Sequence, residues 1–121
     1  MNTAHDLLWR PGPERVAAAN LTRFMGAASQ AAAAPLNDYD ALWQWSVDQP
    51  AAFWSLLWDF CGVVGDKGGT VLEDGDKMPG ARWFPQGRLN YAENLLRFAG
   101  PEDALVFWGE DKVKRRLSRD Q

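Results

Sequence analysis

Residues 38–62 read DYDALWQWSVDQPAAFWSLLWDFCG and carry the clearest structural signal in the chain. Asp38 is a favoured helix N-cap residue, so a helix is predicted over residues 39–48. Pro50 suits the first turn of a second helix, which is predicted over residues 50–61. The stretch therefore predicts a pair of short helices rich in aromatic residues.

Aromatic side chains dominate the predicted faces of this pair. In the first helix, Leu42 and Trp43 share the apolar side, whereas Trp45 lies off it, and an exposed Trp there would favour an interface. In the second helix, we expect Trp54 and Trp58 to be buried against the helical segment that precedes the pair. A ligand-stacking platform is the alternative, but aromatic residues at helical spacing more often form a core.

A longer helix is predicted before the pair, over residues 13–33. Pro13 suits its first turn, and Pro35 stops it. Apolar residues recur along it at spacings of four, three and four, at Ala17, Leu21, Phe24 and Ala28.

The composition allows one domain with a thin core. The chain has 121 residues, too few for two domains or for a complete nucleotide-using enzyme of several hundred residues. Hydrophobic residues make up 46%, but many of these are alanine and none is isoleucine. Large aromatic side chains, with 7 Trp, 6 Phe and 2 Tyr, compensate in part.

Glycine and proline recur through residues 62–89, and this composition predicts an extended segment rather than a helix. The run Gly62–Thr70 resembles a phosphate-binding loop superficially. That motif places Lys directly after its second Gly and Ser or Thr directly after the Lys, whereas here Lys67 follows Asp66 and precedes Gly68. A connector is the better interpretation.

The C-terminal third predicts a short helix over residues 90–98 and a β-hairpin over residues 104–117. Ser118 and Gln121 then form a capping box, which indicates that a further helix begins there. The predicted fold is thus mostly α, with an extended Gly/Pro segment and a C-terminal β-hairpin.

Several classes of function are disfavoured by the composition. The net charge is −3, and the basic residues in 112–119 are expected to lie on a solvated strand face and a helix start, so neither nucleic acid nor a membrane surface is an expected partner. With Cys61 and His5 the only residues of their types, neither a disulfide, a Cys/His zinc site nor a Ser-His-Asp triad is expected. No secretory signal is visible in residues 1–10, so the expected location is cytoplasmic.

Several strings resemble the N-terminal region of acetoacetyl-CoA synthetases, members of the acyl-adenylate-forming superfamily. The most specific are residues 83–97, WFPQGRLNYAENLLR, and residues 45–47, WSV. Further similarities follow in the right order along nearly the whole chain: Trp9, Pro11, Arg23-Phe24, Tyr39, Leu42, Phe53-Trp54 and Trp58-Asp59-Phe60.

The resemblance implies a leading segment of an α/β adenylate-forming enzyme rather than a complete domain, truncated before the AMP-binding body. The intact family enzyme is an AMP-forming acid–thiol ligase that uses ATP, Mg²⁺ and CoA to convert acetoacetate to acetoacetyl-CoA. Its phosphate loop, adenine and ribose motifs and catalytic lysine do not occur in residues 1–121. The resemblance therefore assigns no catalytic, cofactor-binding or metal-binding residue here, no cofactor to this chain, and as partner the missing body of the same enzyme.

Two other interpretations stay open. The chain could be the equivalent fragment of an acetyl- or propionyl-CoA synthetase, which shares the Phe53-Trp54 and Leu89-Asn90 elements more loosely. It could also be a freestanding interaction module whose Trp-rich helices bind a partner protein. Whether the chain is itself an enzyme is left open by the sequence, and as a fragment it is expected to be inactive alone.

Overall fold

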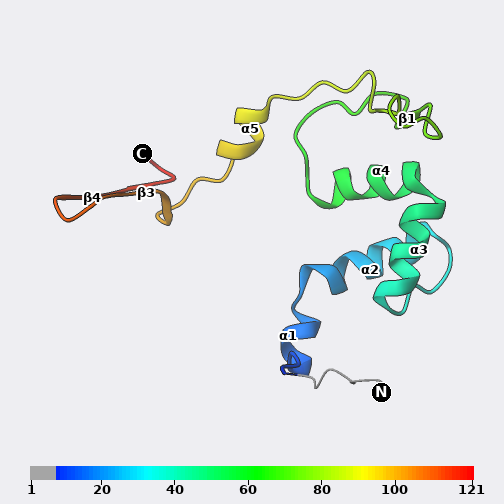
Figure 1. Ribbon diagram of the computed structural model, residues 1–121, viewed down its shortest axis with the longest axis horizontal. Coiled ribbons are helices and arrows are strands. Elements are labelled where there is room, and N and C mark those ends of the chain that lie inside the picture. The colour runs from blue at the N-terminus through cyan, green and yellow to red at the C-terminus, as the bar shows by residue number, and fades with distance from the viewer. Residues whose placement is uncertain (1–7) are drawn as a thin grey trace, which may run out of the picture. The chain divides into compact units, whose positions relative to one another are not determined.

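The computed structural model describes residues 8–121 (Figure 1). The chain divides into two compact units, one ending at Gly62 and one covering Val63–Gln121. The first unit is helical, and the second contains two small antiparallel sheets and one short helix. The mostly helical fold with a C-terminal hairpin is therefore confirmed. The expectation for His5 lies outside the described residues.

The helix expected over residues 13–33 is two helices, α1 (Pro13–Ala17) and α2 (Asn20–Ala31). The chain breaks between them because Ala19 is extended, with ψ 141°. The helix also ends two residues earlier than predicted. A residue that precedes proline is disfavoured in the helical region, and Ala33 next to it adopts a left-handed φ of 50°.

The next two helices lie where they were predicted, as α3 (Tyr39–Asp48) and α4 (Pro50–Phe60). The Asp38 side chain accepts a hydrogen bond of 2.8 Å from the Ala41 N–H, which satisfies one of the open donors at the start of α3. Pro50 is the first residue of α4, and Gly62 leaves the end of α4 with φ 59°.

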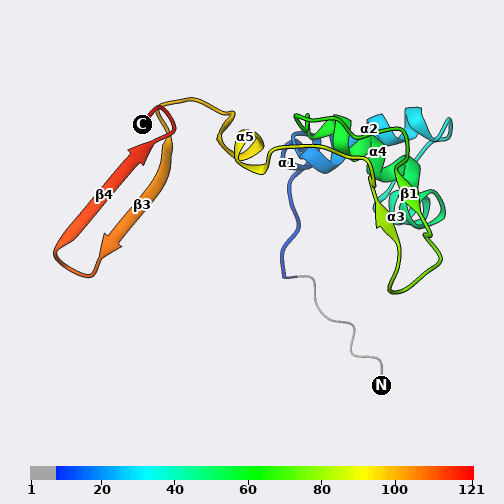
Figure 2. The same cartoon turned by 90° about the horizontal axis from the view of Figure 1, so that it is seen from above.

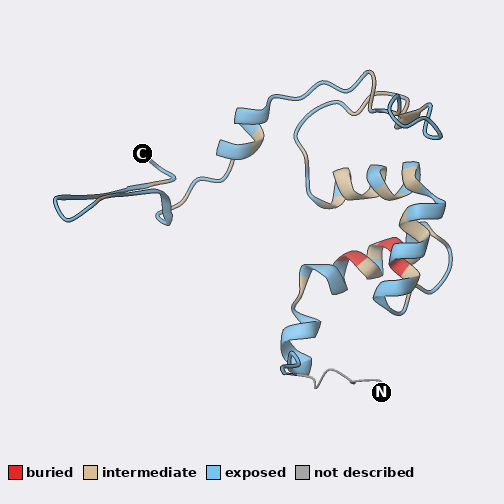
Figure 3. Cartoon of the chain, in the orientation of Figure 1, coloured by how far each residue is buried: buried red, intermediate tan, exposed pale blue. Residues whose placement is uncertain are grey.

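The core of the first unit is small and lies where α2, α3 and α4 meet (Figure 3). Phe24 is 6% exposed and Leu42 is 4% exposed, with Ala28 also buried. The Phe24 ring makes edge contacts with Phe53 and Phe60, at centroid distances of 5.7 Å and 5.1 Å. Such edge-to-face pairs add to the stabilisation from burial.

Two sequence-based assignments to this core were wrong. Trp45 packs against the core, whereas Trp43 is 53% exposed. On α4, the packed side is the i, i+4 set beginning at Phe53, and Trp54 is 43% exposed while Trp58 lies outside the core cluster. Both helices are rotated relative to the prediction, because either apolar set has helical spacing and only tertiary packing decides between them.

The Gly/Pro segment folds back on itself in the second unit. Strand β1 (Leu72–Glu73) pairs antiparallel with β2 (Arg82–Trp83), in the register Leu72↔Trp83 and Glu73↔Arg82. Helix α5 (Tyr91–Leu96) follows and is shorter than the predicted 90–98. The Asn90 side chain caps it by accepting a hydrogen bond from the Glu93 N–H.

The C-terminal hairpin consists of β3 (Asp103–Gly109) and β4 (Val113–Ser118), which run antiparallel side by side (Figure 2). It begins and ends within one residue of the predicted bounds. The Ser118 N–H donates to the Gln121 side chain at 3.1 Å, which is one half of the predicted capping box.

Candidate functional site

The glycine-rich run after α4 is filled by the chain's own returning segment. A Cβ on Gly65 would lie 2.7 Å from the Arg88 carbonyl oxygen, and one on Gly68 would lie 2.8 Å from Cβ of Gln86. Gly68 also has a φ of 71°, which favours glycine. These two glycines therefore allow two backbone segments to approach closely, and the space that a phosphate would need is occupied.

Several backbone donors of the same run already have acceptors within the chain. The Asp66 N–H donates to the Arg88 carbonyl at 2.8 Å, and the Arg88 N–H donates back to Asp66 at 2.7 Å. The Gly68 N–H donates to the Asp66 carboxylate at 2.8 Å. A phosphate loop presents its N–H groups to the ligand, so this arrangement does not fit ATP or CoA phosphates.

The Asn94 side chain joins the start of the segment to α5. Its Oδ1 accepts a hydrogen bond of 2.8 Å from the Val64 N–H, and its Nδ2 donates to the Val64 carbonyl at 2.7 Å. The amide thus pairs with both backbone groups of one residue that lies 30 positions earlier in the sequence. These two hydrogen bonds hold the start of the Gly/Pro segment beside α5, the helix that follows the segment.

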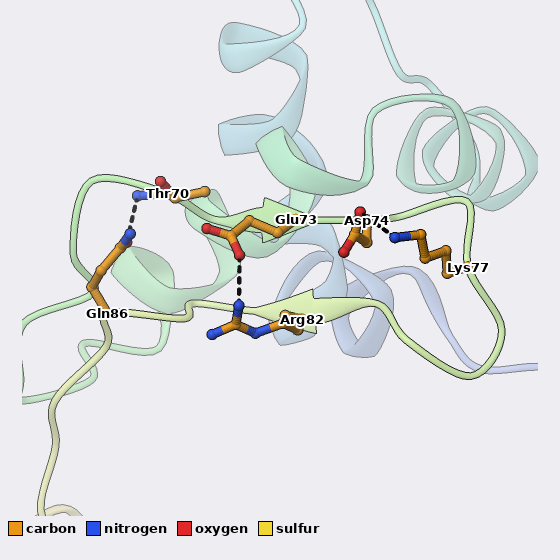
Figure 4. Close-up of polar contacts among 6 residues, drawn as sticks. All are labelled: Thr70, Glu73, Asp74, Lys77, Arg82 and Gln86. Atoms are coloured by element: carbon orange, nitrogen blue, oxygen red, sulfur yellow. Dashed lines mark hydrogen bonds and ion pairs between the residues drawn. The ribbon is translucent and has the colours of Figure 1, made fainter.

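Exposed polar pairs hold the β1–β2 turn (Figure 4). The Arg82 guanidinium lies 3.0 Å from the Glu73 carboxylate, and the Lys77 ammonium lies 2.9 Å from Asp74. The Thr70 N–H donates to Gln86 Oε1 at 3.2 Å. Glu73 and Asp74 are therefore each paired with a cation in solvent, as suits a structural turn.

No metal centre or membrane span is found in the described part of the chain. Within residues 8–121, no three His, Cys, Asp or Glu side chains gather where they could hold a metal ion. Among the helices of the same range, none is both long and apolar enough to traverse a bilayer.

An apolar groove of about 450 Å³ opens on the first unit between α2, α3 and α4. Exposed Trp43 and Tyr39 form part of its wall, and the core residues Phe24 and Leu42 form its floor. Cys61 also lines the groove. The groove offers apolar surface with few polar groups that could orient a small ligand.

The hairpin carries a second apolar surface. Because side chains alternate along a strand and opposite residues share a face, Leu105, Phe107, Val113, Arg115 and Leu117 lie together on one face, called here the apolar face. The other face carries Val106, Trp108, Lys114 and Arg116 and is called here the basic face. The basic cluster that was expected on a solvated strand face is thus divided: Arg115 lies on the apolar face, and Lys114 and Arg116 lie on the basic face.

Comparisons with known proteins find similarity to CoA synthetases. A family profile described as "Acetyl-coenzyme A synthetase N-terminus" matches residues 39–95. An acetoacetyl-coenzyme A synthetase of Rhizobium meliloti is 46% identical over 94% of this chain and 18% of its own length. The acetoacetyl-CoA synthetase of Macaca fascicularis is 36% identical over 76% of this chain and 14% of its own length.

A solved structure shows the same similarity. The acetoacetyl-CoA synthetase from Streptomyces lividans superposes with a TM-score of 0.78 at 38% identity, over 92% of this chain and 18% of that one. This chain therefore spans less than a fifth of the length of the relatives that it matches.

Proposed function

Because the chain corresponds to the N-terminal region of the acetoacetyl-CoA synthetases, we propose that it serves as the N-terminal segment of an acetoacetate–CoA ligase. The observation that carries the proposal is the structural match over 92% of the chain at 38% identity. In this role the enzyme forms acetoacetyl-AMP and pyrophosphate from ATP and acetoacetate, and CoA then displaces AMP.

The chain's own contribution is structural. Residues 86–89 lie close against its glycine-rich run, and Glu73 and Asp74 are paired with cations, so we expect ATP, Mg²⁺ and CoA to be held by the rest of the enzyme. The transition state of adenylation needs fixed positive charge around the phosphates, which no described arrangement here supplies. We therefore expect the chain to be inactive alone, and to lie with the rest of the ligase in the cytoplasm.

A chimera tests this role. The 121 residues replace the corresponding segment of the Rhizobium meliloti enzyme, whose sequence is 46% identical over 94% of this chain. With ATP, Mg²⁺, acetoacetate and CoA, the chimera should release AMP within about tenfold of the parent rate, and the isolated chain should stay at background. Turnover by the isolated chain, or an inactive chimera beside an active parent, would contradict the proposal.

Acetoacetate is proposed as the acid substrate because the relatives from a bacterium and a primate are both named acetoacetyl-CoA synthetases. A malonamoyl-CoA synthetase of Penicillium aethiopicum is also related, at 30% identity over 75% of this chain. Acetoacetyl and malonamoyl groups both carry a carbonyl at the β position, unlike acetyl and propionyl groups. Extending the reading frame past Gln121 and assaying the encoded protein with acetate, propionate and acetoacetate would distinguish these acids.

The interaction-module alternative has one observation in its favour, the exposure of Trp43 and Trp54 on the first unit. A free module must fold by itself, whereas a leading segment can depend on the enzyme body. An isolated chain that unfolds cooperatively, together with an inactive chimera, would favour the module.

A further inference from the structure

We propose that the apolar face of the β3–β4 hairpin is a docking surface for the remaining part of a full-length synthetase. We further propose that Arg115 within this face pairs there with a carboxylate. The inference rests on the proposed function and adds which side of the hairpin makes the contact. Its partner is an apolar surface of the enzyme body that carries an acidic side chain.

The two faces of the hairpin differ in composition. On the apolar face Leu105 lies opposite Leu117, and Phe107 lies opposite Arg115. Four of its five side chains are hydrocarbon, and together they line one shallow hollow. On the basic face, both cross-strand pairs join an apolar residue to a cation, Val106 to Arg116 and Trp108 to Lys114.

Both cations of the basic face already have partners within the hairpin. The Lys114 ammonium lies 4.6 Å from the centre of the Trp108 ring, a cation–π contact that covers part of the indole. The Arg116 guanidinium pairs with the Asp103 carboxylate. Neither cation needs a partner from outside, so this face is suited to remain in water.

Arg115 differs from both of those cations. Within residues 8–121 it forms no ion pair, although it stands among apolar side chains. Covering the apolar face would remove its charge from water, which is costly unless an opposite charge meets it. The docking partner must therefore supply an acidic group at that position.

A two-stranded hairpin is marginally stable by itself and needs packing on at least one face. Phe107 is 59% exposed here, and its neighbours on the apolar face are similarly open. Since the chain covers only 18% of its matched relative, more than four-fifths of that enzyme is available to cover this surface. Because most of the relative's length lies outside the region that this chain covers, the enzyme body is the proposed partner of the apolar face.

Two matched substitutions in the chimera test the assignment. Phe107→Glu places a carboxylate on the apolar face opposite Arg115, and Val106→Glu places one on the basic face opposite Arg116. The two parent side chains have similar exposure, 59% and 53%, and each new carboxylate lies opposite an arginine, of which Arg116 is already paired with Asp103. Any difference between the variants therefore reports which face is covered.

The readout is tryptic cleavage within residues 112–116, where Lys112, Lys114, Arg115 and Arg116 offer sites in the hairpin. A docked hairpin resists cleavage until it opens locally. Phe107→Glu should raise the cleavage rate at least about tenfold, and Val106→Glu should leave it within about twofold of the unsubstituted chimera. Arg115→Glu removes one of these sites but should raise cleavage at Lys112, Lys114 and Arg116 as Phe107→Glu does.

Each other outcome has a defined meaning. Equal cleavage of the two variants in an active chimera, or faster cleavage of Val106→Glu, would overturn the docking assignment and leave the proposed function standing. A dimer of the isolated chain that Phe107→Glu dissociates and Val106→Glu does not would assign the apolar face to a second copy instead. An inactive chimera would overturn both proposals.

Discussion

At the scale of single residues, Asn94 makes a side-chain contact in the second unit that joins positions 30 residues apart. It pairs with both backbone groups of Val64 and also donates to the Asn90 carbonyl at 3.0 Å. Asn94→Ala keeps a good helix former in α5 but removes these bonds, so we expect a loss of about 1–2 kcal/mol in local stability. Hydrogen exchange at the Val64 amide measures it.

Glu93→Ala is the matched control for this substitution. Glu93 is the neighbouring exposed residue of α5, and its side chain makes no hydrogen bond among the described residues. Exchange at Val64 should be unchanged in this variant. Equal exchange rates at the Val64 amide in the Asn94→Ala variant and the parent would show that the Asn94–Val64 hydrogen bonds do not contribute to local stability.

Phe24 and Trp43 make a second residue-scale pair. Phe24 is 6% exposed and contacts two aromatic rings, so Phe24→Ala should lower the free energy of unfolding of the first unit by about 3–5 kcal/mol. Trp43→Ala removes a larger but 53% exposed side chain and should cost less than about 1 kcal/mol. Hydrogen exchange of the α3 amides in the chimera compares them, and a costlier Trp43→Ala would contradict the core formed by Phe24 and Leu42.

At the scale of elements, adjacent glycines in the folded-back segment have different roles. Gly68 has φ 71° and a close neighbour in Gln86, whereas a Cβ on Gly69 would meet nothing within 4 Å. Gly68→Ala should therefore cost about 1–2 kcal/mol, and Gly69→Ala close to nothing. Hydrogen exchange of the Asp66 and Arg88 amides reports this difference, because these two amides form the bridge next to Gly68. Equal effects of the two substitutions would mean that the close approach at Gly68 is not required.

The same scale shows what the sequence could predict. The starts of α3 and α4 follow from Asp38 and Pro50, because capping and proline geometry act within one turn. The break at Ala19 has no local signal, since alanine favours continuation of the helix.

Longer-range features could not be predicted in the same way. The choice of Trp45 over Trp43 for the core depends on contact with another helix, and the pairing of Asp66 with Arg88 depends on a return of the chain 22 residues later. No single stretch of sequence contains that information. The resemblance to a known family identified the N-terminal region, but it did not indicate which hairpin face is covered.

At the scale of the whole molecule, apolar exposure greatly exceeds apolar burial. In the described residues only Phe24, Ala28 and Leu42 form the buried core, whereas large hydrophobic residues are exposed in every helix and both hairpin strands. Small domains have little stability to spare, because conformational entropy offsets most of the gain from burial. The isolated chain should therefore lack the cooperative stability of an independent domain.

Thermal unfolding of the isolated chain tests this expectation. We expect a broad, shallow transition in far-UV circular dichroism with weak near-UV signals from the tryptophans, because five of the seven tryptophans are more than 40% exposed. Within the chimera the same rings should gain near-UV signal, since the enzyme body covers the exposed surfaces. A sharp transition above about 60 °C for the isolated chain, in the upper range of mesophilic domains, would instead show a self-sufficient module and would shift the balance toward the interaction-module function.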